Sequence, residues 1–238
     1  MMPERIVRQL GVATQHRSAI IGTMVERTPE GATPRYTRWL NELTQEQLMF
    51  QRFKECTVAM PTWFLHRSIF DAVGGFNEAG RGTPEDMDFF YAHLERGGQL
   101  VRVDQRLVLY RYHGDGASQS VTQDTIFQRR VGALQRQLLT HLDKFSIWGG
   151  KEARKLFNSL RGDLQSRVTA FLDIHPRKVG TIYAFRGAKI PVLHWEAAQQ
   201  TEHQPVIVCV KAELTGGAFE INLASLHLEE GRQYYLME

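Results

Sequence analysis

The chain has 238 residues, of which 42% are hydrophobic and 23% are charged. This composition is ordinary for a globular protein and excludes a collagen-like, coiled-coil or wholly disordered chain. The formal net charge is only +3, so charge by itself does not indicate a nucleic-acid partner.

Cysteine usage and hydropathy bear on the compartment. The two cysteines, Cys56 and Cys209, are too few for a disulfide-stapled secreted module and favour a reducing environment. No apolar run approaches the roughly 18 residues that a spanning helix needs. Pro3, Glu4 and Arg5 interrupt any signal-peptide core at once. We therefore expect a cytoplasmic protein without a membrane span.

The first half of the chain mixes helical and extended patterns. Pro3 favours a helix start, and a helix over 3–12 is expected to turn Ile6, Val7 and Leu10 inward. The other expected elements of this half are strands at 18–25, 56–60, 99–103 and 106–112, helices at 44–53, 66–72 and 125–142, and a loop at 28–35.

The clearest helix start lies at Thr83. Thr83 is a good N-cap, and Pro84 suits the first helical position. Apolar residues follow at helical spacing until Gly97-Gly98 closes the helix. Asp86 then has two compatible interpretations: it belongs to a capping box with Thr83, or it is a general base held at a helix N-terminus. Asp86 and Asp88 are two residues apart on a helix, so they point to different faces and do not form a chelating pair.

The pattern changes near Asp143, where we place the boundary between domains 1–142 and 143–238. A strand at 145–148, the pair Gly149-Gly150, a helix at 151–160 and a strand at 168–172 follow one another, with more strands at 190–193 and 206–210. This alternation predicts a parallel α/β unit. The spacing from Gly149 to Asp173 is near the ~20 residues that separate the glycine turn from the ribose-binding acid of a Rossmann unit. A structural appendage without a ligand fits the same pattern, because only two glycines of the Gly-x-Gly-x-x-Gly motif are present.

Three short motifs occur in order within residues 56–120. They are Gly74-Gly75-Phe76, then Pro84-Glu85-Asp86-Met87-Asp88-Phe89, then Tyr110-Arg111-Tyr112-His113 with Ser118 and Ser120. Together they resemble the acceptor half of a family 2 inverting glycosyltransferase of the GT-A fold. The resemblance implies an α/β protein, in which a partial GT-A domain is followed by a small Rossmann-like domain.

The resemblance also implies a reaction. A sugar, N-acetylglucosamine among the candidates, would pass from a UDP-sugar to an acceptor hydroxyl with inversion. Asp86 is the implied base that deprotonates the acceptor, with Glu85 and Asp88 in support. Inversion needs one in-line attack on the anomeric carbon, so a single base opposite the leaving nucleotide suffices.

Other residues receive binding roles from the resemblance. Trp63, Gly74, Gly75 and Arg111 are implied at the substrate site, with Trp63 stacking on a sugar ring and Arg111 facing phosphates. His113 would complete the shell of a divalent metal, Mn or Mg. The structural alternatives are a core tryptophan, a surface-paired arginine and a hydrogen-bonded loop histidine.

Members of this family carry an upstream half that ends in an Asp-x-Asp metal motif. Residues 1–6 resemble the stretch directly after that motif, so we expect the chain to start downstream of the metal site. Two alternatives to an active transferase stay open: a nucleotide-binding regulatory module over 143–238, and a non-catalytic truncated isoform.

Overall fold

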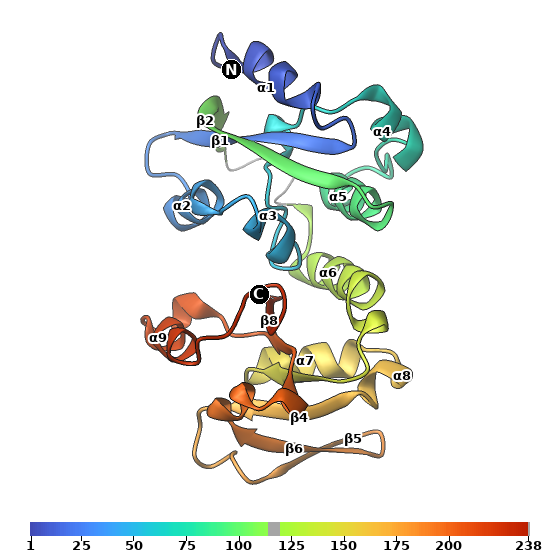
Figure 1. Cartoon of the computed structure of the whole chain (residues 1–238), viewed down its shortest axis with the longest axis vertical. Coiled ribbons are helices and arrows are strands. Elements are labelled where there is room, and N and C mark those ends of the chain that lie inside the picture. The colour runs from blue at the N-terminus through green and yellow to red at the C-terminus, as the bar shows by residue number, and fades with distance from the viewer. Residues whose placement is uncertain (114–119, 238) are drawn as a thin grey trace. The chain divides into compact units, whose positions relative to one another are not determined.

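The structure, a computed structural model, describes residues 1–113 and 120–237. It divides into two units, each built from helices and strands (Figure 1). The first unit is Met1–Arg52 with Cys56–Arg129, and the second is Phe53–Glu55 with Arg130–Glu238. The chain therefore has an α/β fold, and most of its strand pairs are parallel.

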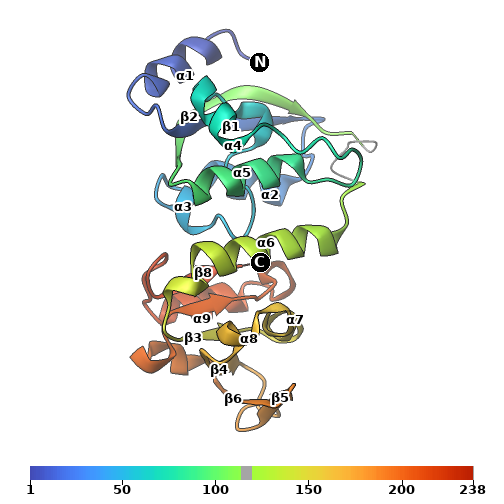
Figure 2. The same ribbon diagram turned by 90° about the vertical axis from the view of Figure 1, so that its right-hand side faces the viewer.

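A parallel strand pair is the centre of the first unit. β1 (Ala19–Thr28) runs beside β2 (Gln99–Arg111), with Ala19 opposite Gln99 and Thr28 opposite Arg111. β2 is one strand where two were expected, because register shifts around Met24 absorb its extra residues without breaking the pairing. The helices of this unit are α1 (Arg5–Ala13), α2 (Pro34–Glu42), α3 (Gln47–Phe50), α4 (Arg67–Val73), α5 (Glu85–Glu95) and the first part of α6 (Gln123–Gln137) (Figures 1 and 2).

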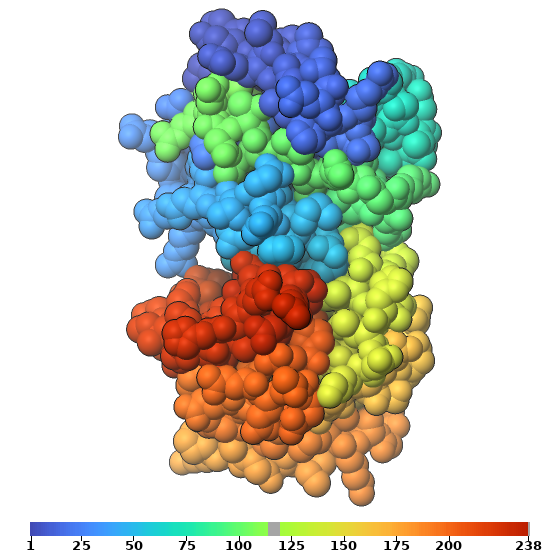
Figure 3. Space-filling model, viewed as in Figure 1, coloured from blue at the N-terminus to red at the C-terminus, as the bar shows by residue number. Residues whose placement is uncertain are grey.

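Helix α1 exposes the apolar side chains that were expected to face inward. Ile6, Val7 and Leu10 are all exposed, Val7 to 74%. The buried residue is Gln9, whose amide donates to the carbonyls of Ile21 and Thr62, both at 2.7 Å. Two buried backbone acceptors thus decide which face of α1 turns inward. The first residues of the chain form part of the molecular surface in the space-filling view (Figure 3).

The expected strand at 56–60 is wrong. Residues 56–59 are buried, but they are irregular, with a bend at 57–58, and a 3-10 helix follows at Met60–Thr62. The hydroxyl of Thr57 donates to the carbonyl of Leu48 at 2.6 Å, which attaches this irregular segment to α3. Residues 56–59 are buried without pairing to a neighbouring strand, which is why their apolar run resembled a strand.

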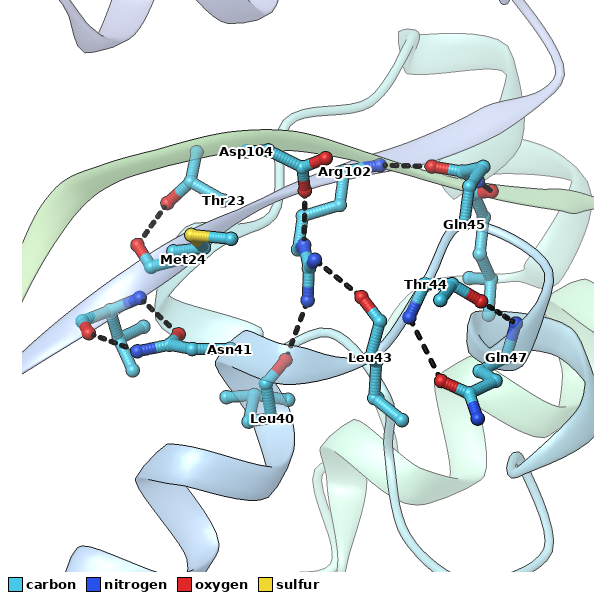
Figure 4. Close-up of polar contacts among 12 residues, drawn as sticks. Thr23, Met24, Leu40, Asn41, Leu43, Thr44, Gln45, Gln47, Arg102 and Asp104 are labelled. Carbon is cyan, nitrogen blue, oxygen red and sulfur yellow. Dashed lines mark hydrogen bonds and ion pairs between the residues drawn. The ribbon is translucent and has the colours of Figure 1, made fainter.

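A buried arginine joins α2 to β2. The Arg102 side chain is 5% exposed, and its guanidinium donates to the carbonyls of Leu40 and Leu43 at the end of α2 and to Asp104 (Figure 4). The carbonyls at a helix end lack intrahelical partners, and this side chain supplies them. Residues 34–42 form a helix, and the first two of them fall within the loop that was expected over 28–35.

The second unit contains a six-stranded sheet in the order β5-β6-β4-β3-β7-β8. All neighbouring strands are parallel except β5 and β6. Its elements are β3 (Phe145–Trp148), α7 (Lys151–Ser159), α8 (Gly162–Gln165), β4 (Val168–Asp173), β5 (Ile182–Phe185), β6 (Ala188–His194), β7 (Val206–Val208), α9 (Ala218–Ser225) and β8 (Tyr234–Leu236).

The strand order reverses at β3. From β3 the chain moves outward through β4 and β6, then returns to the other side of β3 for β7 and β8. All four residues of β3 are buried, so this strand lies at the centre of the sheet. The expected parallel α/β unit is confirmed, although the short strands β5 and β8 were not predicted.

The division between the units falls within α6, ahead of the expected boundary at residue 143. Arg130 pairs with Glu55 at 2.8 Å, and the side chain of Gln135 accepts the Arg161 amide at 3.0 Å. Arg167 donates to the carbonyls of Leu139, Thr140 and Leu142, which follow α6. These contacts attach the later part of the helix to the second unit. None of the described helices is long and apolar enough to cross a membrane.

Candidate functional site

The carboxylates expected at the site lie at the start of α5. This helix begins at Glu85, and its N-cap residue is Pro84 rather than the expected Thr83. The N-cap residue makes no side-chain hydrogen bond to the helix. Asp86 lies in the first turn, where its Oδ1 accepts the backbone amide of Met87 at 2.8 Å. This bond satisfies one of the amides that a helix start leaves without an intrahelical partner. The carboxylate of Asp86 is thereby fixed at a helix N-terminus, and the side chain is half-buried.

Asp88, one half-turn further, has a different environment. Its Oδ1 is 2.6 Å from Nε of Arg129, and its Oδ2 accepts from the amide of Asn77 at 3.1 Å. Both oxygens are therefore engaged by protein donors. Asp88 ties the segment before α5 to α6, which is a structural role, and its support of the base stays a prediction.

Trp63 lies in an aromatic cluster. Its ring is 5.6 Å from Phe89, 6.4 Å from Phe76 and 6.5 Å from Phe90, measured between centroids. Its indole Nε1 donates to the carbonyl of Val58 at 2.9 Å. A tryptophan with a satisfied nitrogen and stacked faces is typical of a core position. The structural alternative to sugar stacking therefore accounts for these ring contacts and for the indole hydrogen bond.

The two glycines of the first motif end helix α4. Gly74 and Gly75 both have positive φ, 94° and 84°, and both amides donate to the carbonyl of Phe70 at 3.1 Å. A left-handed turn after a helix is where glycine is favoured. The turn brings Phe76 back over the aromatic cluster, 4.8 Å from Phe89. Local geometry thus explains this motif without a ligand.

Arg111 and His113 follow at the end of β2, and both side chains are exposed. Ser118 of the same motif lies outside the described residues. Ser120 is described, and its hydroxyl accepts the amide of Gly82 at 3.0 Å. Ser120 of the third motif therefore contacts Gly82, which lies in the segment before α5.

The divalent metal that the resemblance implies has no candidate site among the described residues. Within 1–113 and 120–237, no three His, Cys, Asp or Glu side chains gather to hold an ion. His113 is exposed, and both oxygens of Asp88 are engaged by Arg129 and Asn77. These residues do not fit a metal centre, and we derive no step through a metal.

A pocket of about 250 Å³ lies in the second unit, at the carboxyl ends of β3 and β4. Gly149 and Gly150 follow β3 there, and Asp173 ends β4. Gly149 has a φ of 145°, and a Cβ at this position would lie 3.0 Å from the carbonyl oxygen of Cys209. Only glycine lets the turn approach so closely. The polar side chains that line the pocket are those of Asp173, His175, Lys178, Thr215 and Asn222.

Asp173 is almost buried in this pocket and is held from two sides. Its Oδ2 lies 2.8 Å from Nζ of Lys178, and its Oδ1 accepts the amide of His175 at 2.9 Å. The sequence pointed to Asp173 through its spacing from Gly149, but it carried no signal for Lys178. That lysine reaches the site because the chain turns back after β4, which spacing alone does not reveal.

Comparison with known proteins adds no assignment. A scan against models of known protein families finds none that matches this chain, and a search of the solved structures finds no match either. The assignment of function therefore depends on the residues and their geometry.

Proposed function

We propose that this chain is the acceptor half of an inverting glycosyltransferase of family 2. It would transfer a sugar, with N-acetylglucosamine as the first candidate, from a UDP-sugar to an acceptor hydroxyl. The ordered motifs over residues 56–120 support the family. The observation that carries the reaction is the position of Asp86, a half-buried carboxylate fixed at the first turn of α5.

A general base needs a fixed carboxylate that a substrate hydroxyl can reach. The amide of Met87 holds Oδ1 of Asp86, and the side chain is not fully buried. Positive partial charge at the start of α5 favours the ionised form that accepts a proton. In the proposed step, Asp86 takes the hydroxyl proton while the acceptor oxygen bonds to the anomeric carbon and the UDP leaves with the bond electrons.

The test compares Asp86→Asn with the wild type, each joined at its N-terminus to the expected Asp-x-Asp half. Transfer from UDP-N-acetylglucosamine to a panel of hydroxyl acceptors is measured. Loss of a general base typically costs about 10²–10⁴ in rate, so we expect a loss of that order. Asp71→Asn is the matched control, because Asp71 is an exposed acid on α4 paired with Arg67.

Near-equal rates in the Asp86→Asn protein and the wild type would remove Asp86 from the role of base. No transfer by the wild type, with a normally folded chain, would favour the non-catalytic alternative. A normal melting curve for each variant separates lost chemistry from lost folding.

A second candidate function belongs to the second unit: it is a Rossmann-like module that binds a nucleotide. In open parallel sheets, ligands bind outside the carboxyl ends of the strands where the strand order reverses. The 250 Å³ pocket lies at that place, between the strands that leave β3 on either side. Asp173 ends the second parallel strand, which is the position of a ribose-binding acid. A ribose hydroxyl there would share Asp173 with Lys178.

A further inference from the structure

Helix α7 carries a concentration of positive charge on one face. Lys151, Arg154 and Lys155 are three and four residues apart, so their side chains lie together on the helix surface. With Lys178 they line a second, larger pocket of about 630 Å³. The other described residues of its lining are Asn158, Ser159 and Tyr183, and none of the seven is acidic.

Two cations of this pocket, Lys151 and Arg154, are exposed on the surface of α7. Among the described residues, no carboxylate pairs with Lys151 or Arg154. The acid nearest in sequence, Glu152, pairs instead with Lys211 at 3.3 Å. A bound anion would supply the opposite charge that Lys151 and Arg154 lack among the described residues.

The pocket is organised rather than a loose group of surface lysines. The Arg154 guanidinium lies 5.3 Å from the centre of the Tyr183 ring, and the Tyr183 hydroxyl donates to Asn158 at 3.0 Å. These contacts orient the arginine, whose planar fork suits the oxygens of a phosphate. Lys178 is positioned by Asp173 at 2.8 Å.

The basic pocket and the 250 Å³ pocket share one lining residue. Lys178 lines both of them, and its Nζ is 3.6 Å from where a Cβ of Gly150 would lie. Gly150 directly precedes α7, whose first amides have no side-chain cap. Amides at a helix N-terminus add to the attraction for an anion that the cations create.

We propose that the basic pocket of α7 binds a phosphate group of a small phosphorylated ligand, through Lys151, Arg154 and Lys178. The inference is independent of glycosyl transfer by the first unit, because every residue that carries it belongs to the second. The phosphate could be free polyphosphate or the diphosphate of a nucleotide whose nucleoside enters the neighbouring pocket. Both sources present the same phosphate chemistry to α7.

Isothermal titration of the full chain with sodium pyrophosphate tests the proposal. Lys151→Gln and Arg154→Gln each remove one charged donor, and we expect each to weaken binding about tenfold. Lys189→Gln is the control: Lys189 is an exposed cation on β6 and neighbours Ile190, the partner of Tyr183 in register. Successive strand residues face opposite sides, so Lys189 points away from the pocket face, and its variant should bind as the wild type does.

Two further arms identify the source of the phosphate. UDP binding more tightly than pyrophosphate, with the difference lost in Asp173→Asn, indicates a nucleotide that occupies both pockets. Equal affinities indicate recognition of the phosphate group alone. Raising the ionic strength from about 0.05 to about 0.5 M should weaken binding in either case, because exposed cations are screened.

The proposal is overturned if pyrophosphate does not bind, or if Lys151→Gln and Arg154→Gln bind as tightly as Lys189→Gln. Both positions are exposed on the surface of α7, so thermal melting of each variant is expected to match the wild type. A change in affinity at constant melting temperature then reports the site and not the fold.

Discussion

At the scale of single residues, two neighbouring acids of one motif have separate tasks. Asp86 accepts a backbone amide of its own helix turn, whereas Asp88 is bound by the side chains of Arg129 and Asn77. Their spacing of two on a helix turns them to different faces, as the sequence indicated. The acid that is proposed for chemistry is therefore oriented by its own helix turn, while its neighbour anchors segments that are distant in the chain.

Asp88→Asn tests the structural role at this scale. The substitution removes the ion pair with Arg129, whose two side chains are 23% and 45% exposed. A partly exposed pair contributes up to about 1 kcal/mol to the free energy of unfolding, and we expect a loss of that size in urea denaturation. Asp71→Asn breaks the pair with Arg67, where the exposures are 59% and 79%, and should have almost no effect. Equal losses of stability in the two variants would show that Asp88 does not anchor the segment before α5.

At the scale of elements, the turn from β3 into α7 packs closely against the residue that follows β7. Gly149 packs closely against the carbonyl of Cys209, the residue that follows β7. The amide of Cys209 in turn donates to the carbonyl of Trp148 at 2.8 Å. Two neighbouring strands are thereby held together at the mouth of the pocket, and the absence of a side chain permits the approach.

Gly149→Ala tests that constraint. The added Cβ meets a backbone oxygen at 3.0 Å and the φ of 145° is strained for alanine. We expect the free energy of unfolding to fall by about 1–3 kcal/mol in chemical denaturation. Gly162→Ala is the control, because no atom lies within 4 Å of its added Cβ and the residue begins helix α8. It should be neutral or slightly stabilising. Comparable losses in both variants would contradict the tight approach at Gly149.

At the scale of the whole molecule, the two units respond to opposite ends of the pH range. Burial lowers the pKa of His93 below its ordinary value of 6.5 and outweighs the hydrogen bond from the ring Nε2 to the carbonyl of Gln99 at 3.1 Å, which acts to raise it. In the second unit, burial first and then Glu230 raise the pKa of Tyr234 to about 12. Both groups are therefore kept neutral in the folded chain.

The expected stability profile follows from proton linkage. Above pH 6.5 His93 is neutral in both states; as the pH falls below 6.5 the unfolded chain gains a proton first, so the free energy of unfolding decreases. Below pH 10 Tyr234 is neutral in both states; between pH 10 and about 12 the unfolded chain loses its proton first, and stability decreases again.

Urea denaturation across pH measures both decreases in stability, the acid limb and the alkaline limb of the profile. His93→Gln should flatten the acid limb and leave the alkaline one, and Tyr234→Phe should do the reverse. The slopes with pH, rather than the absolute stabilities, are the quantities compared. An acid limb unchanged in His93→Gln would show that another group causes it.

Much of the second unit could be predicted from the sequence. The strands at 145–148 and 168–173 and the helix between them appear where apolar runs and the Gly149-Gly150 pair placed them. These elements are buried and regular, so local pattern and tertiary environment agree. In the first unit, the inward face of α1 and the expected strand at 56–60 were wrong, because the burial of both segments depends on carbonyls distant in sequence.

The sequence by itself determined the alternation of strands and helices, the glycine turns and the acid at the start of α5, because each depends on residues close together in the chain. Only the tertiary structure decided that Lys178 joins the cations of α7, that Trp63 lies among phenylalanines and that both oxygens of Asp88 are engaged. These are contacts between segments far apart in sequence, and their free energy depends on packing that no local pattern encodes.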